Sequence, residues 1–255
     1  SNGLTFLLPI PTFPFPFAED AHNRENTWVS CPKGGVSMTV LHYIHHAAFS
    51  LNDGKTTLLF DPYLENNPEA YRLVTSKPII SLSATSTATR RRSYAIAKRT
   101  EALIITTAEI AKDAKAMALT PRHAYRRQHE FPFGKVKLTL AFHGSGIAGG
   151  HACGFIVHFD GSVFYFAGDT GFLRIWSSSA NAMPSTTPSS PLAKLHHGPD
   201  DAAYAAGLLN AKTVIPIHYN TWPLIDQDPE EFKNVVEKET SSKVLIVPCG
   251  TRVDL

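Results

Sequence analysis

Short apolar runs alternate with polar turns along most of the chain from Met38 onward. Runs rich in β-branched and aromatic residues, bounded by turn residues, are typical of β-strands. The dipeptides Asp53-Gly54 and Asp160-Gly161 mark turns, and the second predicts a hairpin. The predicted strands are 38–44, 47–53, 55–62, 77–83, 102–107, 135–143, 154–160, 162–169 and 212–219.

Helical spacing of apolar residues interrupts this strand pattern from residue 93 onward. The predicted helices are 93–100, 108–118, 199–211 and 228–239. The last begins with Asp228 as its cap and Pro229 at its first position. Strands come first and then alternate with helices, which predicts an α/β protein with two packed sheets and helices outside.

Three parts of the chain do not follow these patterns. Residues 1–37 are rich in Pro and Phe early and polar later, so we expect an irregular N-terminal extension before one domain over 38–255. Residues 173–197 have no period and are rich in Ser, Thr and Pro. Residues 84–92 lie between a predicted strand and a predicted helix, and their Ala, Ser, Thr and Arg side chains suggest no function.

Composition limits the partners that the protein could have. Apolar residues make up 43% of the chain and the net charge is +2, which gives no reason to expect a nucleic acid or a membrane as partner. The three cysteines, Cys31, Cys153 and Cys249, are too far apart for a Cys-x-x-Cys pair, which favours a reducing compartment. We therefore expect a cytoplasmic protein with a small-molecule substrate, and a homo-oligomer stays open.

Three predicted strands end on a residue that binds metals. These residues are His143, Asp169 and His218, and a fourth candidate, His46, lies in the turn of "YIHHAAF". Imidazole nitrogen and carboxylate oxygen suit Zn²⁺ or Mn²⁺. Each residue alone also has an ordinary explanation, because a histidine is often an unremarkable surface or core residue and the aspartate of "GDT" also caps turns.

Several longer stretches resemble the metallo-β-lactamase superfamily. They include "LLFDPYLENNP", "FPFGKVKLTLAFHGSG", "FAGDTG" and "IPIHYNTWPLIDQDPEEF", and the resemblance covers the chain from Met38 to Leu255 with breaks. Within this superfamily, the stretches resemble a small single-domain branch of metal-dependent hydrolases, which is related to the bacterial ascorbate-6-phosphate lactonase. The resemblance implies a four-layer αββα sandwich with a one- or two-metal site at one edge of the two sheets.

The resemblance also implies roles for individual residues. His143, Asp169 and His218 match the second half of the family's ligand set, with Asp169 as the bridging carboxylate. His46 matches a histidine that lines the site and contacts the substrate, and Asp61 matches an aspartate that supports the metal loop. The implied activity is hydrolysis of a small ester, lactone or phosphoester by a metal-bound hydroxide, with two Zn²⁺ or Mn²⁺ ions.

The first half of the ligand set is missing. The family's His-x-His-x-Asp-His motif aligns with Ala84, Ser86, Ala88 and Thr89, none of which is a usual metal ligand. One interpretation is a degenerate member that has lost its metal. The other is that compensating frameshifts affect 84–92, 117–127 and 171–197, because permitted codons for 84–89, read in another frame, encode His-Glu-His-Gly-Asp.

Three functions therefore remain open at the level of the sequence. The first is a metal-dependent hydrolase, and the second is a non-catalytic binding protein with a degenerate metal site. The third is a nuclease, an activity that is common in the superfamily. The near-neutral charge and the lack of a basic stripe with interleaved aromatic residues argue against the nuclease.

Overall fold

A computed structural model of the protein describes residues 39–63, 80–82, 87–119, 121–123, 129–170, 189–194 and 199–255. These residues belong to one compact unit, Val36–Leu255. The predicted N-terminal extension, 1–37, lies outside the described residues, as do parts of the three segments for which we consider frameshifts.

The first sheet contains seven strands in the order β14-β1-β2-β3-β4-β5-β6. Strands β14, β1, β2 and β3 pair antiparallel, whereas β3, β4, β5 and β6 pair parallel. In that order, their bounds are Arg252–Asp254, Val40–His45, Ala48–Asn52, Thr57–Phe60, Ile80–Leu82, Leu103–Thr106 and Pro121–His123.

The second sheet also contains seven strands, in the order β13-β12-β11-β10-β9-β8-β7. Strands β7 to β10 pair antiparallel and β10 to β13 pair parallel. The predicted turn between β9 and β10 is confirmed, because Asp160 and Gly161 both have positive φ, as a tight hairpin requires. In sheet order, the bounds are Lys243–Val244, Thr213–Ile217, Ser189–Lys194, Ser162–Phe166, His151–Phe159, Gly134–Gly144 and His129–Phe131.

The two sheets pack face to face around the main hydrophobic core. Phe49 and Phe60 of the first sheet stack with ring centroids 4.3 Å apart, and Phe166 of the second sheet meets both rings edge-on. All three side chains are almost completely buried. Alternate residues of several strands enter this core, such as Phe155, Val157 and Phe159 of β9, which is why the strand periodicity could be read from the sequence.

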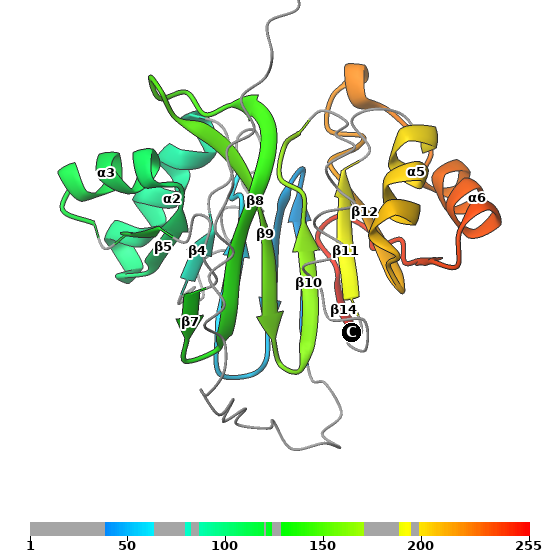
Figure 1. Ribbon diagram of the computed structural model, residues 1–255, viewed down its shortest axis with the longest axis horizontal. Helices are drawn as coiled ribbons and strands as arrows, with labels where there is room; N and C mark the ends of the chain where they lie inside the picture. The colour runs from blue at the N-terminus through cyan, green and yellow to red at the C-terminus, as the bar shows by residue number, and fades with distance from the viewer. Residues whose placement is uncertain are drawn as a thin grey trace, which may run out of the picture. The chain divides into compact units, whose positions relative to one another are not determined.

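Helices cover the outer face of each sheet. On the first sheet, α2 (Thr87–Thr100) and α3 (Ala108–Ala116) bury Ile96 and Ile110. On the second sheet, α5 (Pro199–Leu209) and α6 (Pro229–Glu239) pack against its other face. Figure 1 shows the two pairs of helices on opposite flanks of the sheets. The predicted four-layer αββα architecture is therefore confirmed.

Several boundaries differ from the sequence prediction. Helix α2 begins at Thr87, six residues earlier than expected, and so contains the run of three arginines. The closing segment, 243–255, contributes β13 to the second sheet and β14 to the first. The predicted cap of α6 is confirmed, since the Asp228 carboxylate accepts a hydrogen bond of 2.9 Å from the Glu230 amide.

None of the described helices combines the length and the apolar character that a bilayer-spanning segment needs.

Candidate metal site

Strand direction brings the candidate residues to the same edges of the two sheets. In the second sheet, β8, β10 and β12 run in one direction, because β8 and β10 are both antiparallel to β9 and β12 follows β10 through parallel pairings. In the first sheet, β1, β3 and β4 share one direction for the same reason. The carboxyl ends of strands with one direction meet at one edge, the usual place for a ligand site in α/β proteins.

His143 and Asp169 form a close pair at the edge of the second sheet. His143 lies near the end of β8, and Asp169 follows β10. His143 Nε2 is 3.4 Å from Asp169 Oδ2. The Phe142 amide donates a hydrogen bond of 2.8 Å to Thr170 Oγ1, which fixes the end of β8 against the loop that follows β10. The backbone thus holds the two side chains together.

The second ring nitrogen of His143 is also placed. His143 Nδ1 lies 2.9 Å from the Gly144 carbonyl oxygen, so Nδ1 carries the proton and donates it. Nε2 faces the Asp169 carboxylate. Metal-binding histidines commonly donate their other N–H to a backbone carbonyl in this way.

The spacing of the pair suits one cation. Two ligands at about 2.0–2.1 Å from a tetrahedral Zn²⁺ lie about 3.4 Å from each other. The 3.4 Å between His143 Nε2 and Asp169 Oδ2 matches that value. The donor chemistry and the spacing at these two residues therefore fit a divalent metal ion.

His46 and His218 form a second pair, which joins the edges of the two sheets. The His218 amide donates to the His46 carbonyl oxygen at 2.9 Å, and the centroids of the two rings are 3.7 Å apart. Both residues are almost fully buried, and both have positive φ, 56° at His46 and 66° at His218. Non-glycine residues rarely adopt this conformation, and such strained residues cluster at functional sites.

Tyr43 supports this second pair from the core. Its hydroxyl donates to the His46 carbonyl oxygen at 2.9 Å and lies 3.3 Å from the His218 amide. Burial raises the pKa of Tyr43 well above its usual range, so the hydroxyl stays protonated and able to donate. Tyr43 thus holds the backbone of both histidines in register.

Aromatic side chains surround the His46 ring. Trp222 lies 4.6 Å and Tyr63 4.9 Å from His46, measured between ring centroids. Thr221 Oγ1 is 2.9 Å from His46 Nδ1 and fixes the orientation of the ring. Tyr43, Thr170, Thr221 and Trp222 were not predicted as site residues, although three of them lie in the segments "FAGDTG" and "IHYNTWP", beside Asp169 and His218.

The edge of the first sheet offers fewer donors. Asp61 follows β3, is 1% exposed and has a φ of 33°. Ala84 and Ser86 lie outside the described residues, and Thr89 is buried in the first turns of α2. In the parts of the chain that the structure describes, no three His, Cys, Asp or Glu side chains form a group that could hold a metal ion. The structure therefore brings the predicted residues together as two pairs, and the complete ligand set stays a prediction.

Arg90, which lies before the predicted helix 93–100, is a buried residue of α2. Its Nη1 donates to the Ser145 carbonyl oxygen at 2.9 Å, and its Nε lies 3.5 Å from the Asp113 carboxylate. The side chain is almost fully buried. Arg90 therefore ties α2 to α3 and to the segment just after His143.

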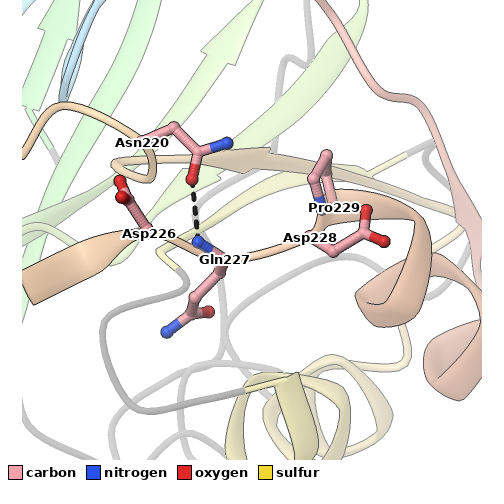
Figure 2. A pocket seen from close by; sticks show the side chains of 5 residues that line it. All are labelled: Asn220, Asp226, Gln227, Asp228 and Pro229. Carbon is pink, nitrogen blue, oxygen red and sulfur yellow. Dashed lines mark hydrogen bonds between the residues drawn. The ribbon is translucent and has the colours of Figure 1, made fainter. Parts of the chain in front are cut away.

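A polar cavity of about 700 Å³ lies in the loop that follows His218. The backbone amide of Gln227 donates a hydrogen bond of 2.8 Å to Asn220 Oδ1, the contact drawn as a dashed line in Figure 2. Gln227 Oε1 is buried and accepts no hydrogen bond from any described residue. The lining residues are Asn220, Asp226, Gln227, Asp228 and Pro229.

Comparison with known proteins gives a consistent set of relatives. No family model matches the chain. A "UPF0173 metal-dependent hydrolase" from Natranaerobius thermophilus is 36% identical over 222 residues, which cover 84% of this chain and 99% of the relative. A protein of the same description from Heliobacterium modesticaldum is 35% identical, and the match covers 84% of this chain and 96% of the relative. Another, from Listeria innocua, is also 35% identical, and the match covers 78% of this chain and 93% of the relative.

Solved structures agree with the fold. Igni18, a metallo hydrolase from Ignicoccus hospitalis, superposes with a TM-score of 0.75 at 26% identity, covering 85% of this chain and 98% of its own. The metallo-β-lactamase fold protein YhfI from Bacillus subtilis superposes with a TM-score of 0.62 at 8% identity, covering 85% and 98%. The second likeness shows the fold alone.

Proposed function

Because the chain belongs to the family of UPF0173 metal-dependent hydrolases, we propose that it hydrolyses a small ester, lactone or phosphoester where β8, β10 and β12 end. His143, Asp169 and His218 would hold the metal, which we take to be Zn²⁺ or Mn²⁺. The observation that carries the proposal is the His143–Asp169 pair, whose 3.4 Å separation and Nδ1–H···O=C orientation suit a shared cation.

Each residue of the site would have a separate task. The bound cation supplies Lewis acidity, which acidifies water and polarises a carbonyl or phosphoryl oxygen. Asp169 is a carboxylate that would accept the proton of the attacking water. His46, with Nδ1 held by Thr221, would direct its Nε2 at the substrate oxygen. Trp222 and Tyr63 would shield this position from bulk water.

The number of ions depends on residues 84–89. The second half of the ligand set fits one ion, whereas Ala84, Ser86, Ala88 and Thr89 offer no imidazole or carboxylate for another. We propose one ion for the chain as written and two for a parent protein in which the motif is intact.

The cavity in the loop that follows His218 supports the proposal of a small polar substrate. Its lining carries the carboxylates of Asp226 and Asp228 and the buried acceptor Gln227 Oε1, which favour a ligand with hydrogen-bond donors. The free thiols of Cys153 and Cys249 support the expected reducing compartment, the cytoplasm.

A second candidate is a non-catalytic binding protein. It is favoured by the four non-ligand residues of the motif and by the lack of a three-residue metal group among the described residues. Such a protein would keep the fold and bind metal weakly or not at all.

Metal content and hydrolysis separate the two candidates. The purified protein is analysed for bound metal, and then assayed on matched lactones, esters and phosphoesters with and without a chelator. The hydrolase requires about one equivalent of Zn²⁺ or Mn²⁺ and chelator-sensitive turnover of at least one class. Asp169→Asn should remove both, while Asp254→Asn, an exposed change on β14, should leave both intact. A protein without bound metal and without turnover is the binding protein.

A further inference from the structure

A cysteine and a histidine, Cys249 and His45, lie in contact where β1 ends. Cys249 Sγ is 3.7 Å from His45 Nδ1 and 3.0 Å from the Ile44 carbonyl oxygen, to which its S–H donates. His45 ends β1, and Cys249 lies between β13 and β14. The two side chains are 204 positions apart in the sequence, so only the fold brings them together.

The backbone holds this contact firmly. The Gly250 amide donates to the Tyr43 carbonyl oxygen at 2.8 Å, and the Tyr43 amide donates to the Thr251 carbonyl oxygen at 3.1 Å. These bonds fix the segment just after Cys249 against Tyr43, two residues before His45 in β1. The thiol is exposed and the imidazole is half-buried, so an ion can reach the pair from solvent.

We propose that Cys249 and His45 form a second metal site, which takes a soft divalent cation such as Cd²⁺ or Zn²⁺. A tetrahedral Zn²⁺ with a sulfur ligand at about 2.3 Å and a nitrogen ligand at about 2.05 Å places the two ligand atoms about 3.6 Å apart. The 3.7 Å between Sγ and Nδ1 is close to that value. Thiolate sulfur is a soft ligand and imidazole is an intermediate one, which is the combination that such cations select.

Binding exchanges a proton for the cation. Burial raises the pKa of the Cys249 thiol and lowers that of His45, so near pH 7 the pair is a neutral thiol beside a neutral imidazole. The arriving cation displaces the thiol proton to solvent, forms one bond to sulfur and one to Nδ1 in the tautomer that carries its proton on Nε2, and keeps water as its remaining ligands. One proton leaves for each ion bound.

This site is chemically separate from the one formed by His143 and Asp169, which contains no sulfur. A thiolate bound to Cd²⁺ absorbs in the ultraviolet by charge transfer, and imidazole or carboxylate ligands do not produce that band. Binding at Cys249 is therefore measured without any assay of hydrolysis, and it stands or falls independently of the proposed function.

The test is a titration of the full chain with Cd²⁺, following the charge-transfer absorption. In the wild-type protein the band should saturate at the absorbance of one thiolate-bound ion per chain, and its formation should release one proton. Cys249→Ser and Cys249→Ala should remove the band, and His45→Gln should weaken binding at least about tenfold. Cys153→Ser, a change in the buried core, and Cys31→Ser should keep the band. A band that persists in both Cys249 variants, or an unchanged affinity in His45→Gln, overturns the proposal.

Discussion

The edges of the two sheets have the same architecture and different chemistry. In the second sheet, His143 is the penultimate residue of β8, and Asp169 and His218 follow β10 and β12. The first sheet ends β1 and β3 before His46 and Asp61, and the segment after β4 carries Ala, Ser and Thr where the family places metal ligands. Strands of both sheets thus lead to candidate site residues, but the predicted metal ligands lie at the edge of the second sheet alone.

This difference shows that the fold and the site depend on separate residues. The sandwich is held by buried aromatic and aliphatic side chains such as Phe49, Phe60 and Phe166, which lie between the sheets. A missing ligand motif leaves those contacts untouched, because burial of apolar surface does not depend on the residues at the strand ends. The fold can therefore persist while the chemistry of one edge is lost.

Removing the His218 imidazole, at the edge of the second sheet, should have the largest effect. In His218→Ala, the only predicted ligand on β12 is lost, so metal-dependent hydrolysis should fall below detection. The measurement is turnover with added Zn²⁺ or Mn²⁺, and His129→Ala, an exposed change on β7, serves as control. Full activity of the His218 variant would break the assignment of this edge.

Restoring the first edge should have the next largest effect. The variant Ala84→His, Ser86→His, Ala88→Asp, Thr89→His supplies the missing motif and should raise bound metal from about one to about two equivalents. Turnover should rise about 100-fold or more, since two ions stabilise the transition state better than one. Elemental analysis and kinetics measure both quantities.

Thr89 is buried, so the variant without Thr89→His is made in parallel to separate misfolding from a failure to bind metal. If a correctly folded variant gains no metal, the two edges do not form one site. Sequencing the gene addresses the same point: codons at 84–89 that cannot yield His-Glu-His-Gly-Asp in another frame remove the frameshift hypothesis.

Two buried tyrosines give a matched test of whether the Tyr43 hydroxyl positions His46 and His218. Tyr43→Phe deletes the hydroxyl between His46 and His218, and Tyr94→Phe deletes one that bonds Ile110 and Asp113. Each change should lower the free energy of unfolding by about 1–2 kcal/mol. Only Tyr43→Phe should also weaken metal binding, by about tenfold. Equal metal affinities in the two variants would show that Tyr43 does not position the site.

The smallest effect concerns His158, which lies near the end of β9 and pairs with Lys135 of β8. Burial, and secondarily Lys135, lower the pKa of His158 from its ordinary value of 6.5. The unfolded state then binds more protons than the folded state. The contribution of His158 to the free energy of unfolding is therefore fully present above pH 6.5 and is lost as the pH falls below that value. His158→Gln should flatten part of this decline in chemical denaturation of the metal-free protein. An unchanged pH profile would assign the decline to other groups.

Much of the fold was predictable because its signals are local. Alternating apolar residues gave the strands, Asp160-Gly161 gave a hairpin, and Asp228 gave the cap of α6. The site was harder to predict, because the contacts of Tyr43 with His218 and of Phe142 with Thr170 join distant positions. The early start of α2 was missed because Arg90 is buried by partners on α3 and near Ser145, which no local pattern reveals.

The most direct test of the central claim is a crystal structure of the protein soaked with Zn²⁺, with an anomalous difference map at the zinc edge. The account predicts a peak about 2.0–2.2 Å from both His143 Nε2 and the Asp169 carboxylate, with His218 as a further ligand. A map without a peak at this pair, while Zn²⁺ is bound elsewhere in the crystal, would contradict it.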